Sequence, residues 1–405
     1  MDNYKNSKQN IFIFLMLVFS IQLFSQSNEE VEKKEQEIKP EVKIGGRIHY
    51  DFEFLSQKNG ISASEDYYFA GQEFRSVYIT AIGSLTKNIK FKLELDFAGG
   101  KMGYRDMYIK FVDIPLIGGN VILGSQAEPS GLELLSGGNY VLFKEKTPLT
   151  ATQNYRWNSG FGYENFNLLN KKLGLQMTYA FNGKNTEGFT DTTLENGAHF
   201  VARLTSPIIE NTEKKQLVHV GVNFENRKYT KEPTNYTLRF RPENHMGYQV
   251  SIPFINLKKQ IDYGFELAAN SGPFSVQSEY ALSGYQTTTK NYQIKSYYAV
   301  VSYFLTGENR KYNEGVFGRV YPYDNLDFDN KTYGAFELLL RFSEINYEQV
   351  MTEGKDDRVK SIAFGLNWYF NSHARLMYNY ILSDFNKSVD NNKLNQHLFR
   401  VQVDF

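Results

Sequence analysis

The C-terminal residues alternate in character, and this alternation constrains the fold more than any other feature of the chain. Apolar and mostly polar side chains follow one another in the order Phe399, Arg400, Val401, Gln402, Val403, Asp404 and Phe405. A period of two places successive side chains on opposite faces of a β-strand. A soluble protein gains little from an exposed apolar face, whereas a transmembrane β-barrel presents such a face to lipid. The segment therefore predicts a membrane strand.

The same period recurs along most of the chain from residue 42. Segments with one apolar and one largely polar face lie at 42–54, 89–97, 261–267, 336–342, 362–370 and 376–380. A tilted membrane strand requires about ten residues. The pattern predicts an all-β fold, an antiparallel transmembrane β-barrel of about 16 strands (16 to 18). The segments 119–126 and 236–241 are the least clear strands.

The polar faces of these segments argue against a soluble sandwich or propeller. Arg, Lys, Asp, Glu, Gly and Asn dominate them through most of the chain. A soluble β-fold would bury this face as its core, at a cost of several kcal/mol for each unpaired charge. A water-filled lumen removes that cost, so a barrel of this size is expected to enclose an aqueous channel.

The connections between the segments are unequal in length. Short turns are expected at 85–88 and 270–273, and long connections at 57–72, 129–153, 184–196 and 306–331. Membrane barrels place short turns in the periplasm and long loops outside the cell. We therefore expect all the long connections at one end of the barrel.

The N-terminal residues predict export. Lys5 and Lys8 precede an apolar run at 11–24, and small and polar residues follow it. The run is shorter than the roughly 20 residues of a membrane-spanning helix. We expect a signal peptide at 1–25, a charged periplasmic tail at 26–41 and the barrel at 42–405. For the tail, a flexible solvated segment is favoured over a short helix.

Composition agrees with an outer-membrane protein of a Gram-negative bacterium. The chain has no cysteine but 29 Tyr and 32 Phe, and aromatic girdles are typical of membrane barrels. Its formal net charge is zero, which gives no electrostatic case for nucleic acid. The six histidines form no His-Glu-x-x-His pair. The glycine-rich segments are not followed by Gly-Lys-Ser or Gly-Lys-Thr, so none of them is a phosphate-binding loop. The sequence thus predicts no enzyme, cofactor or metal site.

Several short stretches carry a more specific resemblance. In chain order they read FRSVYI (74–79), KLELDFAGG (92–100), LGSQAEP (123–129), ARLT (202–205), RFRPE (239–243), SYFLTGE (302–308), GAFEL (334–338) and GLNWY (365–369). Together they resemble the phosphate-selective porin O and P family of outer-membrane proteins. The resemblance implies a trimeric porin of about 16 strands, with an inward-folded loop and an anion pathway lined by Arg and Lys.

Candidate pore-lining cations follow from the alternation and from the family's inward loop. They are Arg203, Arg239, Arg241, Arg341, Arg375 and Arg400 on polar faces, and Lys144 and Lys146 in the loop after Pro129. Arg239 and Arg241 are expected to point the same way from one barrel strand. A cationic constriction attracts phosphate, which Arg can bind bidentately. The same faces also carry carboxylates, and the alternative is that these charges simply pair along the wall; the loop itself could be an ordinary surface loop.

These observations predict an outer-membrane porin for passive diffusion of small hydrophilic solutes. Anions such as phosphate are the expected solutes, and outer-membrane lipid and two further copies of the chain are the expected partners. The alternative function is a structural or adhesive surface protein that acts through its long loops. A barrel hydrolase would need a Ser/His/Asp constellation, and no motif supports one.

Overall fold

The computed structural model describes residues 40–58, 66–100, 102–153, 157–181, 197–230, 235–347, 350, 358–385 and 393–405. The expected signal peptide and all but the last two residues of the expected charged tail lie outside these ranges. So does the whole of the expected long connection at 184–196. The first strand begins at Glu41, one residue before the expected start of the barrel.

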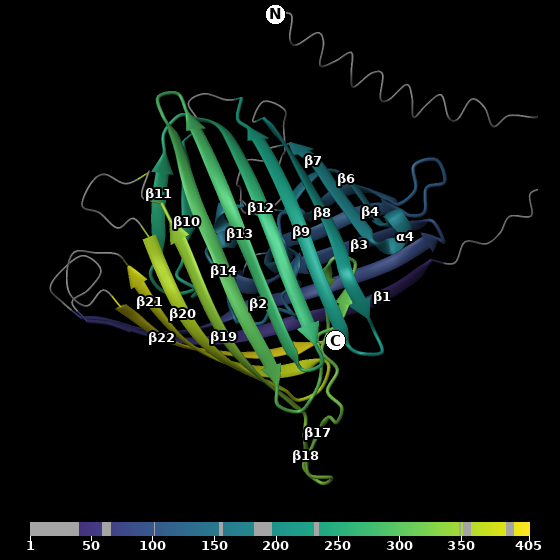
Figure 1. The fold of residues 1–405 in the computed structure, drawn as a ribbon, viewed down its shortest axis with the longest axis vertical. Helices are drawn as coiled ribbons and strands as arrows, with labels where there is room; N and C mark the ends of the chain where they lie inside the picture. The colour runs from purple at the N-terminus through teal and green to yellow at the C-terminus, as the bar shows by residue number, and fades with distance from the viewer. Residues whose placement is uncertain are drawn as a thin grey trace, which may run out of the picture. The chain divides into compact units, whose positions relative to one another are not determined.

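Sixteen antiparallel strands form one closed barrel (Figure 1). They are β1 (Glu41–Gln57), β2 (Tyr67–Thr86), β3 (Ile89–Asp96), β4 (Gly103–Phe111), β5 (Asn120–Ala127), β6 (Trp157–Asn167), β7 (Leu173–Phe181), β8 (Ala198–Asn211), β9 (Gln216–Lys228), β12 (Leu257–Ser271), β13 (Phe274–Thr287), β14 (Asn291–Phe304), β19 (Ala335–Asn346), β20 (Arg358–Tyr369), β21 (Ala374–Phe385) and β22 (Lys393–Asp404). The predicted fold class is confirmed, with the strand number at the lower bound.

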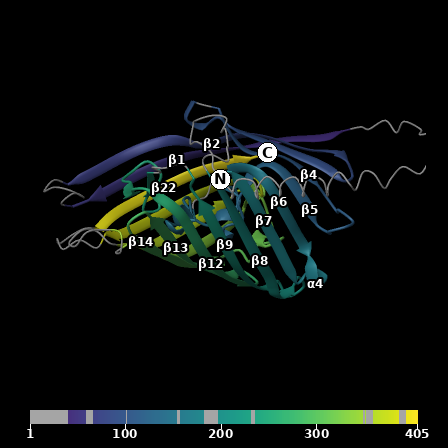
Figure 2. The same ribbon diagram turned by 90° about the horizontal axis from the view of Figure 1, so that it is seen from above.

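The barrel closes where the last strand pairs with the first. β22 runs antiparallel to β1, and the two strands lie side by side in Figure 2. The terminal residue extends this pairing, because Phe405 and Gly46 exchange backbone hydrogen bonds of 3.0 and 3.1 Å. Closure leaves no strand edge unpaired, as a lipid environment requires.

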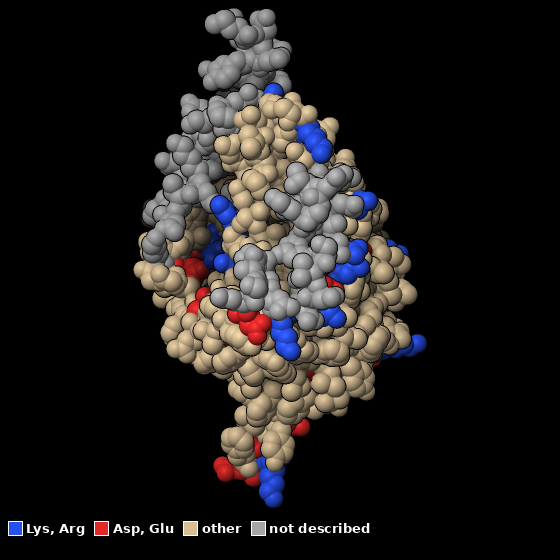
Figure 3. Space-filling model, turned by 90° about the vertical axis from the view of Figure 1, so that its left-hand side faces the viewer, with Lys and Arg blue, Asp and Glu red and all other residues tan. Residues whose placement is uncertain are grey.

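The predicted alternation separates the two faces of the wall. On β22, Arg400 is 3% exposed and faces the lumen, whereas Val403 is 43% exposed and faces outward. Phe405 is 67% exposed at the end of the strand. Figure 3 shows one side of the molecule, on which the visible Lys, Arg, Asp and Glu of the described residues lie in small groups among uncharged residues. No helix in the described residues is long and apolar enough to cross a membrane.

One expected barrel strand is not part of the barrel. The segment at 236–241 forms β10 (Tyr236–Phe240), which pairs only with β11 (Val250–Phe254) in a separate hairpin between β9 and β12. Leu238 and Phe240 pack into the largest apolar cluster that the described residues form. They alternate with Arg239, which therefore points away from that cluster and is exposed. By contrast, the other uncertain segment, at 119–126, forms the barrel strand β5.

The connections divide between two ends of the barrel. One end, here called the turn end, carries the C-terminus and the connections at 87–88, 112–119, 168–172, 212–215, 272–273 and 370–373. The turn at 168–172 contains the short helix α4 (Leu168–Lys171), and η1 (Ala98–Gly100) lies in the β3–β4 connection at the opposite end. Short turns mark the periplasmic side of porins.

The expectation that every long connection lies opposite the short turns is wrong for 306–331. This connection joins β14 to β19, the twelfth and thirteenth strands of the barrel. Because strands alternate in direction, the end of a connection depends on its place in the strand order and not on its length. Residues 305–334, here called the turn-end segment, therefore lie at the turn end (Figure 1).

The turn-end segment is built into the lumen wall. It contains two small hairpins, β15 (Tyr312–Asn313) with β16 (Val316–Phe317), and β17 (Leu326–Asp327) with β18 (Thr332–Tyr333). Phe317 is fully buried in an apolar cluster with Leu132 of the loop that enters from the opposite end. Arg319 pairs with Asp404 and donates a hydrogen bond of 3.3 Å to the Tyr140 hydroxyl. The lumen is thus narrowed from both ends.

The junction of this segment with β19 offers a test of its conformation. Gly334 has a φ of 72°, and a Cβ there would collide with the carbonyl oxygen of Tyr369. We expect Gly334→Ala to lower the free energy of unfolding by about 1–3 kcal/mol, through the left-handed backbone and the collision. This loss of unfolding free energy is measured by urea titration of the folded, heat-modifiable protein in micelles. Gly318→Ala is the matched control, because a Cβ at Gly318 meets nothing within 4 Å; equal losses in both variants would contradict this placement.

Candidate functional site

The connection between β5 and β6 enters the barrel. Its described part, residues 128–153, is here called the inward loop and contains two short helices, α2 (Leu132–Leu135) and α3 (Leu149–Thr152). Leu132 is fully buried, and Phe143 and Leu149 are each 1% exposed. Phe143 and Leu149 pack on apolar lumen-facing residues of β13, β14 and β19 to β22. The loop therefore folds against the wall, and the surface-loop alternative does not describe it.

A carboxylate on β13 holds the start of the inward loop. Glu279 accepts hydrogen bonds from the backbone N–H groups of Leu132 at 2.8 Å and Glu133 at 2.6 Å. The Tyr298 hydroxyl donates to the same carboxylate at 2.6 Å. Three donors on one buried carboxylate fix the position of α2 against the β13–β14 wall.

An arginine on β19 ties the inward loop to the β10–β11 connection. Arg341 donates to Glu243 at 2.6 Å, to the carbonyl oxygen of Glu145 at 3.2 Å and to Glu133 at 3.4 Å. Its guanidinium also lies 4.1 Å from the ring centroid of Phe143. These contacts hold the guanidinium in place, and only its Nε has no hydrogen-bond partner among the described residues.

A line of alternating charges holds the far side of the loop to β1 and β22. Lys144 Nζ lies 2.9 Å from Asp51 and 2.6 Å from Glu53, with all three side chains fully buried. Arg400 binds Asp51 bidentately at 2.7 and 2.8 Å and donates to the Lys144 carbonyl oxygen at 2.7 Å. Two carboxylates of β1 thus fix the loop through one lysine and one arginine.

Most of the predicted cations therefore serve as anchors. Arg203 binds Glu266 at 2.7 Å and the Gly315 carbonyl oxygen of the turn-end segment at 2.8 Å. Arg375 donates to Gln402 and to the carbonyl oxygen of Val141, both at 3.0 Å. Together with Arg341, Arg400 and Lys144, these residues have the geometry expected from charges that pair along the wall.

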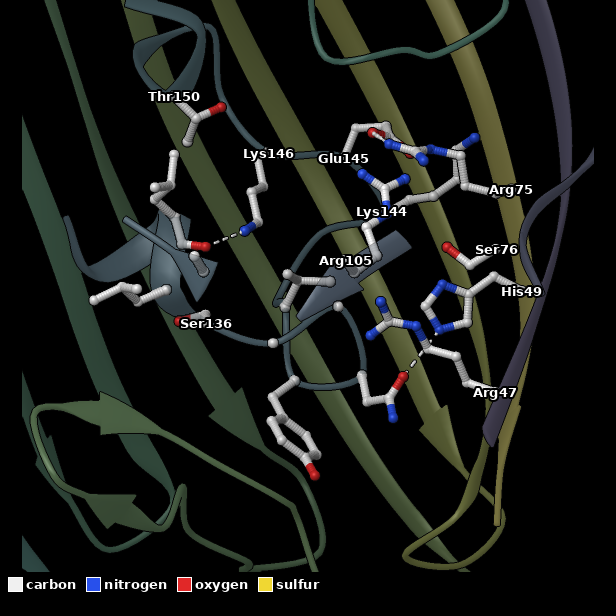
Figure 4. Close-up of a pocket in the computed structure, with 18 of the residues that line it drawn as sticks. Arg47, His49, Arg75, Ser76, Arg105, Ser136, Lys144, Glu145, Lys146 and Thr150 are labelled. Carbon is white, nitrogen blue, oxygen red and sulfur yellow. Dashed lines mark hydrogen bonds and ion pairs between the residues drawn. The ribbon is translucent and has the colours of Figure 1, made fainter. Parts of the chain in front are cut away.

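The open part of the lumen lies on the other side of the inward loop. A cavity of about 670 Å³ runs between this loop and β1 to β6, with the β10–β11 hairpin at one end (Figure 4). Nine cationic side chains line it, namely Arg47, Arg75, Lys92, Arg105, Lys144, Lys146, Arg239, Arg241 and Arg400. Three carboxylates line it, namely Glu94, Asp106 and Glu145.

Four of these cations were not among the predicted residues: Arg47, Arg75, Lys92 and Arg105. Arg47 and Lys92 follow from the alternation of β1 and β3, so a complete count of polar faces would have included them. Arg75 lies at a β-bulge, where the register of β1 and β2 shifts between His49 and Tyr50. Such an extra residue breaks the period of two, and sequence alternation therefore cannot place it.

Arg47 illustrates how the cavity presents its cations. Its guanidinium lies 3.8 Å above the ring centroid of Tyr78, and a Cβ at Gly138 would lie 2.9 Å from its Nη1. Tyr78 thus covers one face of the guanidinium, and Gly138 leaves room beside it. Its Nε has no hydrogen-bond partner among the described residues.

The remaining predicted residues lie at the edge of the cavity or within it. Arg239 and Arg241 line it from the β10–β11 hairpin, so the expectation that both point inward from one barrel strand is wrong. Arg241 donates to the Gly247 carbonyl oxygen at 3.3 Å. Lys146 donates to the Leu134 carbonyl oxygen at 2.5 Å, and burial lowers its pKa to about 8 although Glu133 opposes this shift.

A closed 16-stranded barrel with an apolar outer face and a polar lumen narrowed by an inward loop defines an outer-membrane porin. Residues 42–405 match the family described as "Phosphate-selective porin O and P", and the chain belongs to this family. The family consists of channels, so the prediction that the chain is not an enzyme is confirmed, as is its location in the outer membrane.

Individual proteins agree with this assignment. The chain is 26% identical to Porin O of Pseudomonas aeruginosa over 392 residues, which cover 86% of this chain and 84% of Porin O. Its fold is similar to that of the anion-selective porin from Comamonas acidovorans, with a TM-score of 0.56, 13% identity, and coverage of 91% and 100% of the two chains. OmpT of Vibrio cholerae, solved in a trimer form, gives a TM-score of 0.50 at 13% identity, with coverage of 90% and 99%.

The buried anchor at Lys144 generates a prediction. Lys144→Met would leave Asp51 with one cationic partner fewer and Glu53 without its lysine, and breaking a buried pair costs about 3–5 kcal/mol. We expect a loss of unfolding free energy of that order and a larger, noisier single-channel conductance, because the loop is released. Lys360→Met is the control, since Lys360 is 40% exposed and lies 3.6 Å from Glu344. Unchanged conductance and stability in Lys144→Met would contradict the anchor.

Proposed function

We propose that this porin is a passive channel for small anions such as phosphate. The observation that supports the proposal is the excess of cations around the cavity, nine against three carboxylates. Asp51, Glu53 and Asp96 lie behind the lining and pair with Lys144, Arg400 and Arg105. When these three carboxylates are subtracted as well, an excess of three positive charges remains.

This excess acts at short range in a narrow, water-filled space. Low-dielectric walls focus the field of the lining charges and raise the local concentration of counter-ions. Arg edges can bind phosphate or carboxylate oxygens bidentately. The description of the family as phosphate-selective and of the Comamonas acidovorans protein as anion-selective agrees with this proposal. We further propose removal of residues 1–25 on export and assembly as a homotrimer.

Reversal potentials across planar bilayers test the ion selectivity. In a KCl gradient we expect the wild-type channel to favour chloride over potassium. Arg47→Gln should lower the anion-to-cation permeability ratio roughly twofold or more, because it removes one charge from the lining. Lys87→Gln removes one charge from an exposed turn outside the cavity and should leave the ratio unchanged. A wild-type channel that favours potassium would refute the proposal.

The lowered pKa of Lys146 predicts that the ion selectivity of the channel depends on pH. Its pKa of about 8 means that the ammonium group is largely charged at pH 7 and largely neutral at pH 9. We therefore expect the anion-to-cation permeability ratio to fall as pH rises from 7 to 9. Lys146→Met should show the lower ratio at both pH values, and its own change across this range should be smaller. The same fall in wild type and in Lys146→Met would assign the effect to another group.

A further inference from the structure

A carboxylate of the protein itself lies between two arginines of the cavity wall. Glu145 of the inward loop binds Arg75 through two hydrogen bonds, at 3.1 and 3.3 Å. It also accepts a hydrogen bond of 2.9 Å from Arg400 on β22. Figure 4 shows Glu145 directed at Arg75 on the strand side of the cavity. Two guanidiniums around one carboxylate are the arrangement that binds a free oxyanion.

The two arginines differ in what holds them. Arg400 is fixed by its bidentate contact with Asp51 and by the Lys144 carbonyl oxygen, so it does not need Glu145 to stay in place. Both side-chain hydrogen bonds of Arg75 to described residues go to Glu145. The bulge in β2 directs Arg75 into the lumen from the backbone.

The side chain of Glu145 can leave this position without movement of its loop. The Glu145 carbonyl oxygen is bound by Arg341, and the neighbouring Lys144 N–H donates to Asn379 at 2.8 Å. The backbone is therefore held on the far side, and only side-chain rotation is needed. The pair is accessible from the cavity, since the side chains of Arg75 and Glu145 are 28% and 12% exposed.

We propose that Arg75 and Arg400 form an oxyanion site that Glu145 occupies when the channel is empty, and that a passing carboxylate or phosphate group must displace Glu145 to bind there. Glu145 is then an internal competitor that keeps the site weak, which favours rapid release over tight retention. This inference rests on the proposed anion transport and adds the residue that sets the affinity of the channel for its solute.

The competitor is charged under all ordinary conditions. Burial acts to raise the pKa of Glu145, but the guanidiniums of Arg75 and Arg400 hold it well below its usual range. Titration of this group therefore does not open the site near neutral pH, and exchange with the solute is the only way to free both arginines.

The test compares two neutral isosteres in the same cavity. Glu145→Gln removes the competitor, whereas Glu94→Gln removes one negative charge that pairs with Lys92 at 3.5 Å and does not contact the two arginines. Conductance is measured in planar bilayers as inorganic phosphate, and separately acetate, is raised at constant pH. We expect Glu145→Gln to lower the half-saturating phosphate concentration about tenfold, and Glu94→Gln to change it less than twofold.

Each outcome decides between alternatives. Equal shifts in both variants would overturn the proposal in favour of a general effect of cavity charge, and no shift in Glu145→Gln would overturn it outright. Adding Arg75→Gln to Glu145→Gln should abolish the gain; a retained gain would also overturn it. A wild-type channel selective for cations would instead refute the proposed function.

Two controls accompany these measurements. Heat modifiability shows that each variant is folded. Glu145→Asp, which keeps the charge, should retain a half-saturating phosphate concentration close to that of the wild type.

Discussion

Every feature of this protein depends on the need to satisfy backbone hydrogen bonds in lipid. A strand edge left open in the membrane costs several kcal/mol for each unpaired group, so the sheet must close on itself. The pairing of β22 with β1, extended by Phe405 and Gly46, completes that closure. Closure then divides the alternating residues between lipid and lumen, and many charged residues face the lumen.

Charges crowded into a lumen must pair or face water, and the porin uses both solutions. On the side of β8, β12 to β14 and β19 to β22, arginines and carboxylates fix the inward loop and the turn-end segment. On the side of β1 to β6 the lumen stays open and its cations face a cavity. The same residue type therefore anchors the constriction on one side and lines the passage on the other. Glu145 lies at the boundary, bound to Arg75 of the passage and Arg400 of the anchor.

Local sequence patterns predicted the barrel strands better than the segments and side chains that lie inside the barrel. Alternation identified seven of the sixteen barrel strands, the approximate strand number and the lumen-facing positions of Arg203, Arg341, Arg375 and Arg400. It failed at 236–241, because a two-residue period describes any strand with one buried face, including a hairpin that is not part of the barrel wall. Loop length misplaced 306–331, because the side of a connection follows from strand parity. Arg75 was not predicted to face the lumen, because the β-bulge interrupts the two-residue period from which lumen-facing residues were predicted.

The sequence by itself determined the class of fold, since a period of two repeated over the chain, with many charges on one face, favours a wall between an apolar and an aqueous phase. It also determined which cations face the lumen from regular strands. Only the tertiary structure decided which of them anchor and which remain open to solute. That choice depends on where the inward loop and the turn-end segment lie against the wall, and their contacts join residues far apart in the chain, such as Lys144 with Asp51 and Arg203 with Gly315. The energy of an ion pair depends on the distance between the two charges in space. The spacing of residues along the chain therefore does not show which charges pair.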